Sequence, residues 1–125
     1  MKKIKNFGIG VDIEDFKRFE KLNTIDHSGF LNKIFTKKEI DYCFSKEKPA
    51  PHLAVRFTAK EAVIKALNNI GKPGVVYKEI EIVNNKKGVP IVKLNNKKFN
   101  NLEIKLSLSH SNDRAISFVV AAELN

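Results

Sequence analysis

An apolar, helix-forming stretch at residues 56–67 (RFTAKEAVIKAL) carries four charged side chains: Arg56, Lys60, Glu61 and Lys65. A charge buried without a partner is strongly unfavourable, so the charged side chains of such a helix need opposite charges or hydrogen-bond partners. Three cations around one carboxylate suit a helix that binds a phosphate-rich ligand together with a metal ion. The alternative is two local ion pairs on a helix surface, since Arg56 and Lys60, and Glu61 and Lys65, are helical neighbours. The pattern alone does not choose between these interpretations.

A second carboxylate, Asp12, stands at the end of a predicted buried strand. Apolar residues at positions 7, 9, 11 and 13 alternate with Gly8, Gly10 and Asp12, which indicates a strand with one apolar face. Glycine in a strand often marks a close approach by another backbone or by a ligand. Asp12 and Glu61 together suit Mg²⁺ bound through a substrate phosphate, because Mg²⁺ usually takes one or two protein carboxylates and keeps several waters. The alternative is that Asp12 caps the helix that follows.

His110 ends the strand pattern SLSH and shares a face with Leu106 and Leu108. That parity favours a core histidine, unless the end of the strand opens into a cleft. No Cys/His spacing typical of a zinc site is present. The sequence also has no Walker-type glycine-rich loop and no Rossmann fingerprint.

The elements that must position these residues are helices in the first half of the chain and strands in the second. Residues 36–39 (TKKE) match a capping box, which predicts a helix start. The remaining expected elements are short helices at 14–22 and around 30–35, a loop at 46–51, a long helix from about 53 to 69, and strands around 80–82, 91–94, 102–108 and 115–122. The sequence therefore predicts a single α+β domain over residues 1–125, with an antiparallel sheet packed on a long central helix and short N-terminal helices.

Composition limits the classes of partner. No apolar run is long enough to cross a membrane, the single cysteine, Cys43, cannot form an internal disulfide, and no signal-peptide core follows the basic N-terminus, so we expect a cytoplasmic protein without a membrane partner. The net charge of +9 is compatible with nucleic acid, a polyphosphate ligand or an acidic protein. One alternative is thus a small basic RNA-binding or ribosome-associated module, and another is a non-catalytic interaction domain. Neither explains Glu61 among cations in an apolar helix, and the aromatic residues are not interleaved with lysines as in a nucleic-acid platform, so no nucleic-acid partner is expected.

Three separated segments together resemble one family. They are GIGVDIEDFKRF at 8–19, RFTAKEAVIKAL at 56–67 and SLSHSNDRAISFVVAA at 107–122. Their order and spacing are similar to those of the short bacterial holo-acyl-carrier-protein synthases, which have the 4′-phosphopantetheinyl transferase fold. The resemblance spans nearly the whole chain. Val55, where the family usually has glycine, and the loop after Leu67 depart from its pattern.

The resemblance implies an activity and a set of site residues. The reaction is transfer of 4′-phosphopantetheine from coenzyme A to a serine of apo acyl carrier protein in fatty acid biosynthesis, with release of adenosine 3′,5′-bisphosphate. Asp12 and Glu61 match the family's Mg²⁺ ligands, and Lys65 would add positive charge at the same phosphates during catalysis. The positions that match the lining of its coenzyme A pocket are Arg56, Lys60, Lys65 and His110, with Gly88 and Pro90 in a similar G-x-P turn. The family forms homotrimers whose sites lie between subunits.

The resemblance also gives a purpose to the basic residues of the first helices. An acidic carrier protein could dock on a patch made by Lys17, Arg18, Lys21, Lys33, Lys37 and Lys38. The alternative is an ordinary solvated lysine surface.

Overall fold

The computed structural model describes residues 2–125 as an α+β fold, as the sequence predicts. In chain order the elements are β1 (Ile4–Asp15), the 3₁₀ turn η1 (Phe16–Phe19), α1 (Ser28–Ile34), α2 (Lys37–Phe44), α3 (Pro49–Asn69), η2 (Tyr77–Glu79), β2 (Ile80–Asn84), β3 (Pro90–Leu94), η3 (Lys97–Phe99), β4 (Leu102–Ser111) and β5 (Arg114–Leu124). The capping box at the start of α2 is present. The short helix predicted at 14–22 is confirmed only in part: β1 continues to Asp15, and the helical residues are those of η1.

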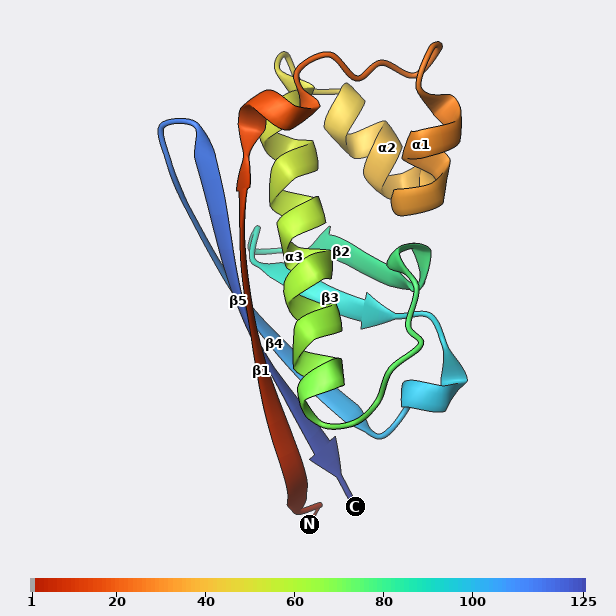
Figure 1. The fold of residues 1–125 in the computed structure, drawn as a ribbon, viewed down its shortest axis with the longest axis vertical. Coiled ribbons are helices and arrows are strands. Elements are labelled where there is room, and N and C mark those ends of the chain that lie inside the picture. Colours follow the sequence, from red (N-terminus) through yellow and green to blue (C-terminus); the bar gives the residue numbers. More distant parts are fainter. Residues whose placement is uncertain (1) are drawn as a thin grey trace.

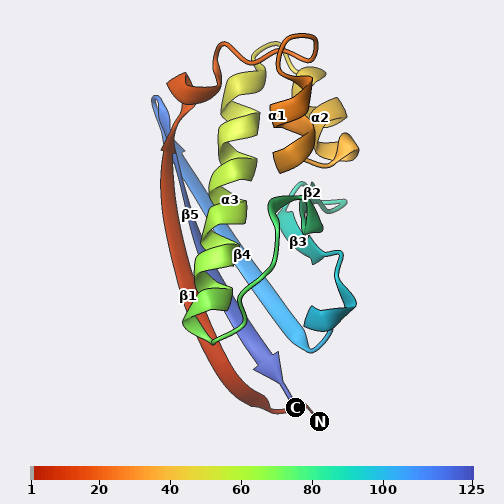
Figure 2. The ribbon, with the colours of Figure 1, turned by 45° about the vertical axis from the view of Figure 1, so that its right-hand side comes forward.

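The strands form two antiparallel sheets rather than the single predicted one. One sheet has the order β1-β5-β4, and the other is the β2-β3 hairpin. Helix α3 lies between them, with the larger sheet on one side and the hairpin on the other (Figures 1 and 2). Helices α1 and α2 pack around the N-terminal half of α3 (Figure 1). A single long helix therefore joins both parts of the core.

Helix α3 begins at Pro49, earlier than the predicted start near residue 53. Two prolines had indicated a loop at 46–51. A proline in the first turn of a helix loses no hydrogen bond, because amides in that turn have no intrahelical partner. The predicted end is confirmed: the helix stops at Asn69, and Gly71 then takes the left-handed conformation (φ +71°).

Gly8 and Gly10 allow the backbone of β1 to lie directly against α3. A Cβ atom at Gly10 would lie 1.9 Å from the carbonyl oxygen of Ala62, and one at Gly8 would lie 2.4 Å from that of Ala66. Both distances are too short for any larger residue. The glycines thus mark a backbone approach, which was one of the two predicted reasons for them, and they turn this side of β1 toward the helix.

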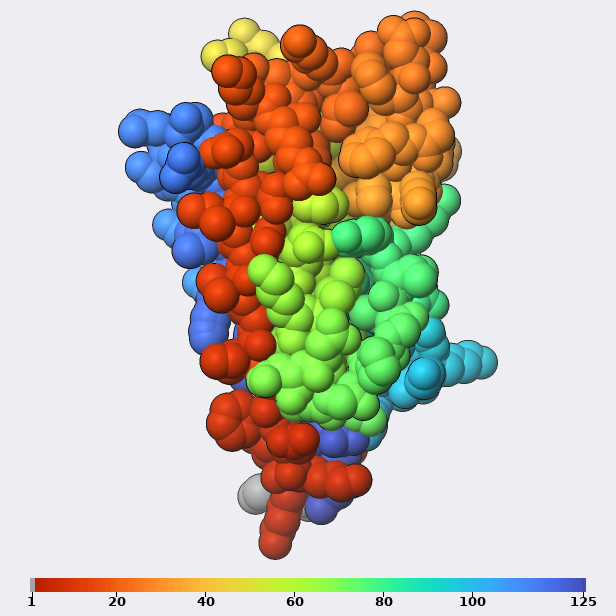
Figure 3. All heavy atoms as spheres, viewed as in Figure 1, coloured from red at the N-terminus to blue at the C-terminus, as the bar shows by residue number. Residues whose placement is uncertain are grey.

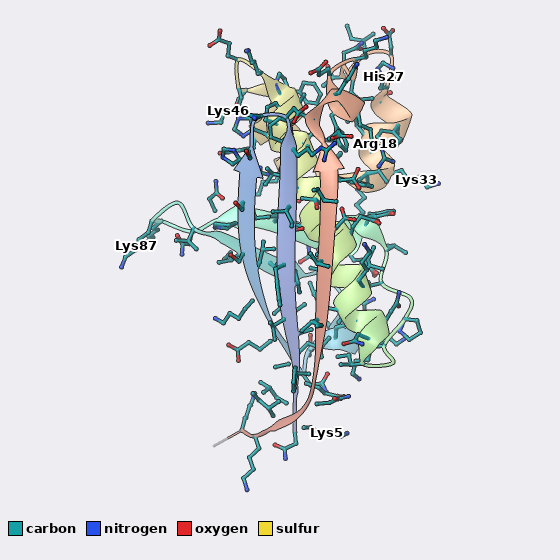
Figure 4. All side chains as sticks on the ribbon, turned by 60° about the vertical axis from the view of Figure 1, so that its left-hand side comes forward. Lys5, Arg18, His27, Lys33, Lys46 and Lys87 are labelled. Carbon is teal, nitrogen blue, oxygen red and sulfur yellow. The ribbon has the colours of Figure 1, made fainter. Side chains whose placement is uncertain are left out.

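The other side of β1 is exposed, so the prediction that the apolar face of this strand is buried is wrong for the single chain. Large apolar residues cover the outer side of the sheet, from β1 (Phe7, Ile9, Val11, Ile13) and from β5 (Ile116, Phe118, Val120). Figure 4 looks onto this side, and in Figure 3 the atoms of β1 lie uncovered beside α3. We call these seven residues the outer apolar face. A continuous apolar surface of this kind usually marks an interaction site.

No helix in the described part of the chain, residues 2–125, combines the length and apolarity that crossing a membrane requires.

Candidate active site

Asp12 is joined to α3 across the fold. Its Oδ2 accepts a hydrogen bond from the hydroxyl of Thr58 at 2.9 Å, and its Oδ1 pairs with the ammonium group of Lys65 at 3.2 Å. Lys65 also donates to the backbone oxygen of Val11 at 3.0 Å. Asp15 is the residue at the cap position of η1, and it makes no side-chain capping bond. The alternative that Asp12 caps the following element is therefore wrong.

Sequence reasoning missed Thr58. Its side chain is fully buried and its hydroxyl lies 3.1 Å from that of Ser117 on β5, as well as bonding Asp12. A buried hydroxyl must find hydrogen-bond partners, and here the partner is the carboxylate. The only signal in the sequence was a threonine inside an apolar helix, and threonine is too common in helices for that to single it out.

Glu61 lies beside a second residue that sequence reasoning missed, Tyr77 of η2. The phenol hydroxyl of Tyr77 donates a hydrogen bond to Glu61 Oε1. This hydrogen bond, together with burial and the negative charge of Glu61, raises the pKa of Tyr77 to about 12, and the charge of Asp12 adds to the shift. Both carboxylates therefore act on the same phenol, and we call the surroundings of Asp12 and Glu61 the acidic region.

A third carboxylate extends this acidic region. Glu14 follows Asp12 on the same side of β1; burial raises the pKa of Glu14, and the charge of Asp12 adds to that effect. The guanidinium group of Arg18 opposes it with an ion pair at 2.7 Å and lies over the ring of Phe57, 4.9 Å from its centroid. Arg18 is thus partly committed to the acidic region.

The acidic region fits a magnesium ion. Carboxylate oxygens are the ligands that Mg²⁺ prefers, and Asp12 and Glu61 reach this region from two separate elements. Within residues 2–125 no group of three or more His, Cys, Asp or Glu side chains is arranged to hold a metal. The remaining ligands would have to be water and a substrate phosphate, which is usual for Mg²⁺.

Four of the other predicted residues share one cavity. This cavity, of about 510 Å³, lies between the β2-β3 hairpin, the end of β4 and the first half of α3, and its lining includes Arg56, Gly88, Pro90 and His110. Gly88 takes the left-handed conformation (φ +79°) in the hairpin turn. His110 is exposed at the end of β4, so the alternative of a core histidine is wrong. The strand end does open into a cleft, as the functional interpretation required.

Arg56 is the buried cation of this cavity. Its side chain is only 5% exposed, its guanidinium carbon lies 4.3 Å from the centroid of the Tyr42 ring, and its Nη1 donates to the backbone oxygen of His52 at 3.4 Å. Its Nε has no hydrogen-bond partner within residues 2–125. A buried donor without a partner is rare in a folded protein.

The surroundings of Arg56 are also cationic. It lines a neighbouring cavity of about 430 Å³ together with Lys38, Lys86 and Lys93. Burial lowers the pKa of His52, and the positive charges of Arg56 and Lys46 lower it further. These cavities therefore have the charge expected of a site for a phosphorylated ligand.

Lys60 does not lie with these residues, although the sequence predicted it in the same pocket. Its side chain is fully buried, and its ammonium nitrogen pairs with Glu39 Oε1 at 2.7 Å and donates to the backbone oxygens of Tyr77 and Ile80. Burial lowers the pKa of Lys60, while the carboxylate of Glu39 opposes that shift. The positive charge of Lys60 is therefore compensated within the protein, by the carboxylate from α2 and by carbonyl oxygens from the segment that begins β2.

The predicted site residues thus form two groups. Asp12, Glu61 and Lys65 form the first, and none of them lines the cavity that holds the second. Lys65 pairs with Asp12 across the fold, which replaces the local Glu61–Lys65 pair considered from the sequence.

The chain matches a known protein family. Residues 8–119 match the model of the 4′-phosphopantetheinyl transferase superfamily, and the chain belongs to this family.

Individual relatives agree with this membership. The chain is 47% identical over 113 residues to a holo-[acyl-carrier-protein] synthase of Thermodesulfovibrio yellowstonii, covering 90% of this chain and 96% of the relative. It is 45% identical over 123 residues to one of Chlamydia muridarum, covering 95% and 97%. Among solved structures, the Helicobacter pylori holo-[acyl-carrier-protein] synthase in complex with coenzyme A is 30% identical, with a TM-score of 0.76 over 90% of this chain and 98% of that one.

The buried Lys60–Glu39 pair can be tested by substitution. Lys60→Met leaves the Glu39 carboxylate buried without its cation, so we expect the free energy of unfolding in urea to fall by about 3–5 kcal/mol. Lys37→Met, which removes the solvent-exposed pair with Asp41, is the matched control and should cost about 0–1 kcal/mol. Equal losses in the two variants would contradict the structural role of Lys60.

Proposed function

We propose that this chain is a holo-acyl-carrier-protein synthase. It transfers 4′-phosphopantetheine from coenzyme A to a serine of apo acyl carrier protein and releases adenosine 3′,5′-bisphosphate, within fatty acid biosynthesis. The observation that carries the proposal is the acidic region, with Asp12 on β1 and Glu61 on α3, on a fold shared with a synthase solved with coenzyme A. Residues 1–125 act as one cytoplasmic domain in this proposal, because α3 spans both parts of the core.

In this proposal the acidic region holds Mg²⁺ through Asp12 and Glu61. When bound, the ion would offset the negative charge that develops on the pyrophosphate and on the leaving group. Lys65, which already lies 3.2 Å from Asp12, adds positive charge at the same oxygens. One of the carboxylates orients a water that accepts the serine proton.

The cavity at the end of β4 binds the nucleotide part of coenzyme A. Arg56 supplies positive charge at the wall of the cavity, and His110, Gly88 and Pro90 are further lining residues. Lys60 has no part in this binding, because its ammonium group is occupied by Glu39 and two carbonyl oxygens. The RNA-binding alternative explains the net charge but leaves the acidic region without a role.

The carboxylates give the most direct test. Asp12→Ala and Glu61→Ala should each abolish transfer, measured as the mass gain of apo carrier protein incubated with coenzyme A and Mg²⁺. The fold should persist, as judged by circular dichroism and thermal unfolding. Glu47→Ala, an exposed carboxylate in the loop before α3, serves as the matched control and should transfer at the wild-type rate. Transfer at near-normal rates in either site variant would exclude this assignment.

We further propose that the enzyme is a homotrimer whose sites lie between subunits. The outer apolar face exposes seven large apolar side chains on one side of the sheet, so a second copy is a suitable cover for it. The separation of the two groups of site residues supports the same arrangement. The acidic region of one copy would then meet the nucleotide cavity of the next.

Charge placed on the outer apolar face tests the trimer. Phe118→Glu should give a monomer in light scattering and should lose transfer, because a buried unpaired carboxylate opposes association. Ile25→Glu, at an exposed isoleucine in the loop before α1, should keep the wild-type mass. A wild-type protein that is monomeric at the concentration of the transfer assay would rule out the trimer.

The exposed cations near η1, α1 and α2 form the proposed surface for the acidic carrier protein. All six predicted residues are exposed, and Figure 4 labels Arg18 and Lys33 at the same end of the molecule. Complementary charge would steer the encounter and align the carrier serine. Charge reversal at Arg18 would also disturb its pair with Glu14 in the acidic region. Lys21 and Lys33 are therefore better probes of docking alone.

Lys33→Glu should raise the apparent KM for the carrier protein several-fold and leave the KM for coenzyme A unchanged. Added salt should raise the wild-type KM for the carrier, because it screens exposed charges. The control is Lys97→Glu in η3, an equal change of charge on another part of the surface. If neither Lys33→Glu nor added salt changes the KM for the carrier protein, this surface does not dock the carrier.

A further inference from the structure

Tyr77 stands beside the acidic region, but nothing in the proposed reaction uses it. It is the first residue of η2, the short turn that leads into β2. Its ring stacks on Phe57 of α3, with centroids 5.7 Å apart and an angle of 27° between the planes. Its hydroxyl donates to Glu61 Oε1, as described above. The side chain is thus held by contacts at the ring and at the hydroxyl.

The backbone of Tyr77 is held just as firmly. Its carbonyl oxygen accepts a hydrogen bond of 2.9 Å from the ammonium group of Lys60, which is itself paired with Glu39. The amide of Val76, the residue before it, donates to the side chain of Glu79 at 3.0 Å. The buried ion pair therefore decides where the phenol of Tyr77 stands relative to α3.

This arrangement constrains Glu61. A glutamate on a helix can turn freely about its side-chain bonds, and binding a ligand then costs conformational entropy. The hydrogen bond from Tyr77 occupies Oε1, and among residues 2–125 no hydrogen bond reaches Oε2. One oxygen is used to hold the carboxylate, and the other stays available. Thr58 has the corresponding position at Asp12, where it donates to Oδ2.

We propose that Tyr77 is a positioning residue that holds the Glu61 carboxylate in the orientation in which it binds the divalent cation. The proposal rests on the proposed function, in which Glu61 is a Mg²⁺ ligand. Hydrogen-bonding partners of metal-ligating side chains orient them, and losing such a partner typically weakens metal binding by about 10–100-fold. Tyr77 itself touches neither the substrate nor the reacting atoms.

Tyr77→Phe is the test, because phenylalanine keeps the ring on Phe57 and removes only the hydroxyl. We expect Mn²⁺ to bind the variant about 10-fold more weakly in calorimetric titrations of the coenzyme A-saturated protein. The Mg²⁺ concentration for half-maximal transfer should rise in parallel. The KM for coenzyme A and the maximal rate at saturating Mg²⁺ should stay near wild type.

Two controls separate positioning from folding. Ser45→Ala also removes a hydroxyl that donates a hydrogen bond, here to the backbone oxygen of Tyr42 at the exposed end of α2, and it should leave Mn²⁺ affinity unchanged. Tyr77→Leu removes the stacked ring as well, so it should lower the unfolding temperature, whereas Tyr77→Phe should not. Wild-type Mn²⁺ affinity in Tyr77→Phe, measured on a folded protein, would overturn the proposal.

The same titrations distinguish this proposal from the proposed function. If wild type binds Mn²⁺, and Glu61→Ala loses that binding while Tyr77→Phe retains it, then only the positioning role of Tyr77 fails. If wild type neither binds Mn²⁺ nor modifies the carrier protein, the proposed function itself fails.

Discussion

The ion pair between Lys60 and Glu39 joins three parts of this structure, α2, α3 and the start of β2. Glu39 closes the capping box of α2 and accepts a hydrogen bond from the amide of Ile82, so one carboxylate ties a helix start to β2. Lys60 brings α3 to the same point and donates to the carbonyl oxygen of Tyr77. Buried pairs of this kind often add little net stability, but breaking one is costly, which favours a single arrangement of the elements it joins. The position of Tyr77 beside Glu61 is one result, so a contact away from the proposed chemistry shapes the acidic region.

Much of this architecture could be predicted from local patterns. The capping box, the helix that contains Glu61, the hairpin turn at Gly88 and the alternation of β4 each depend on a few neighbouring residues, and the structure has all of them. The start of α3 was misplaced because a proline in a first helical turn resembles a proline in a loop. Asp12 reaches Thr58 and Lys65 of α3 because the glycines of β1 bring the two backbones together, and no local pattern predicts those contacts.

What could not be predicted depends on contacts between distant segments. Helical spacing made Arg56 and Lys60 neighbours, but it could not say that Arg56 borders a cavity while Lys60 ends at a carboxylate from α2. Thr58 and Tyr77 carry no motif, since their importance comes from the carboxylates that they reach across the fold. The exposure of the outer apolar face could not be predicted for a related reason. Alternation gives two sides to a strand, and only the packing of α3 decides which side is covered.

The two sides of β1 are constrained by different interactions, although their residues alternate along one strand. At Gly10 the helix backbone leaves room for nothing larger than a hydrogen atom, so a substitution there acts on the folding of each chain by itself. At Val11, one position further, the side chain points away from the helix and is half exposed. In the trimer that we propose, a substitution at Val11 would leave the chain able to fold and act on whether copies recognise one another. Substitutions at these two adjacent positions would therefore cause defects of different kinds. The folding defect would be independent of protein concentration, and the assembly defect would depend on it.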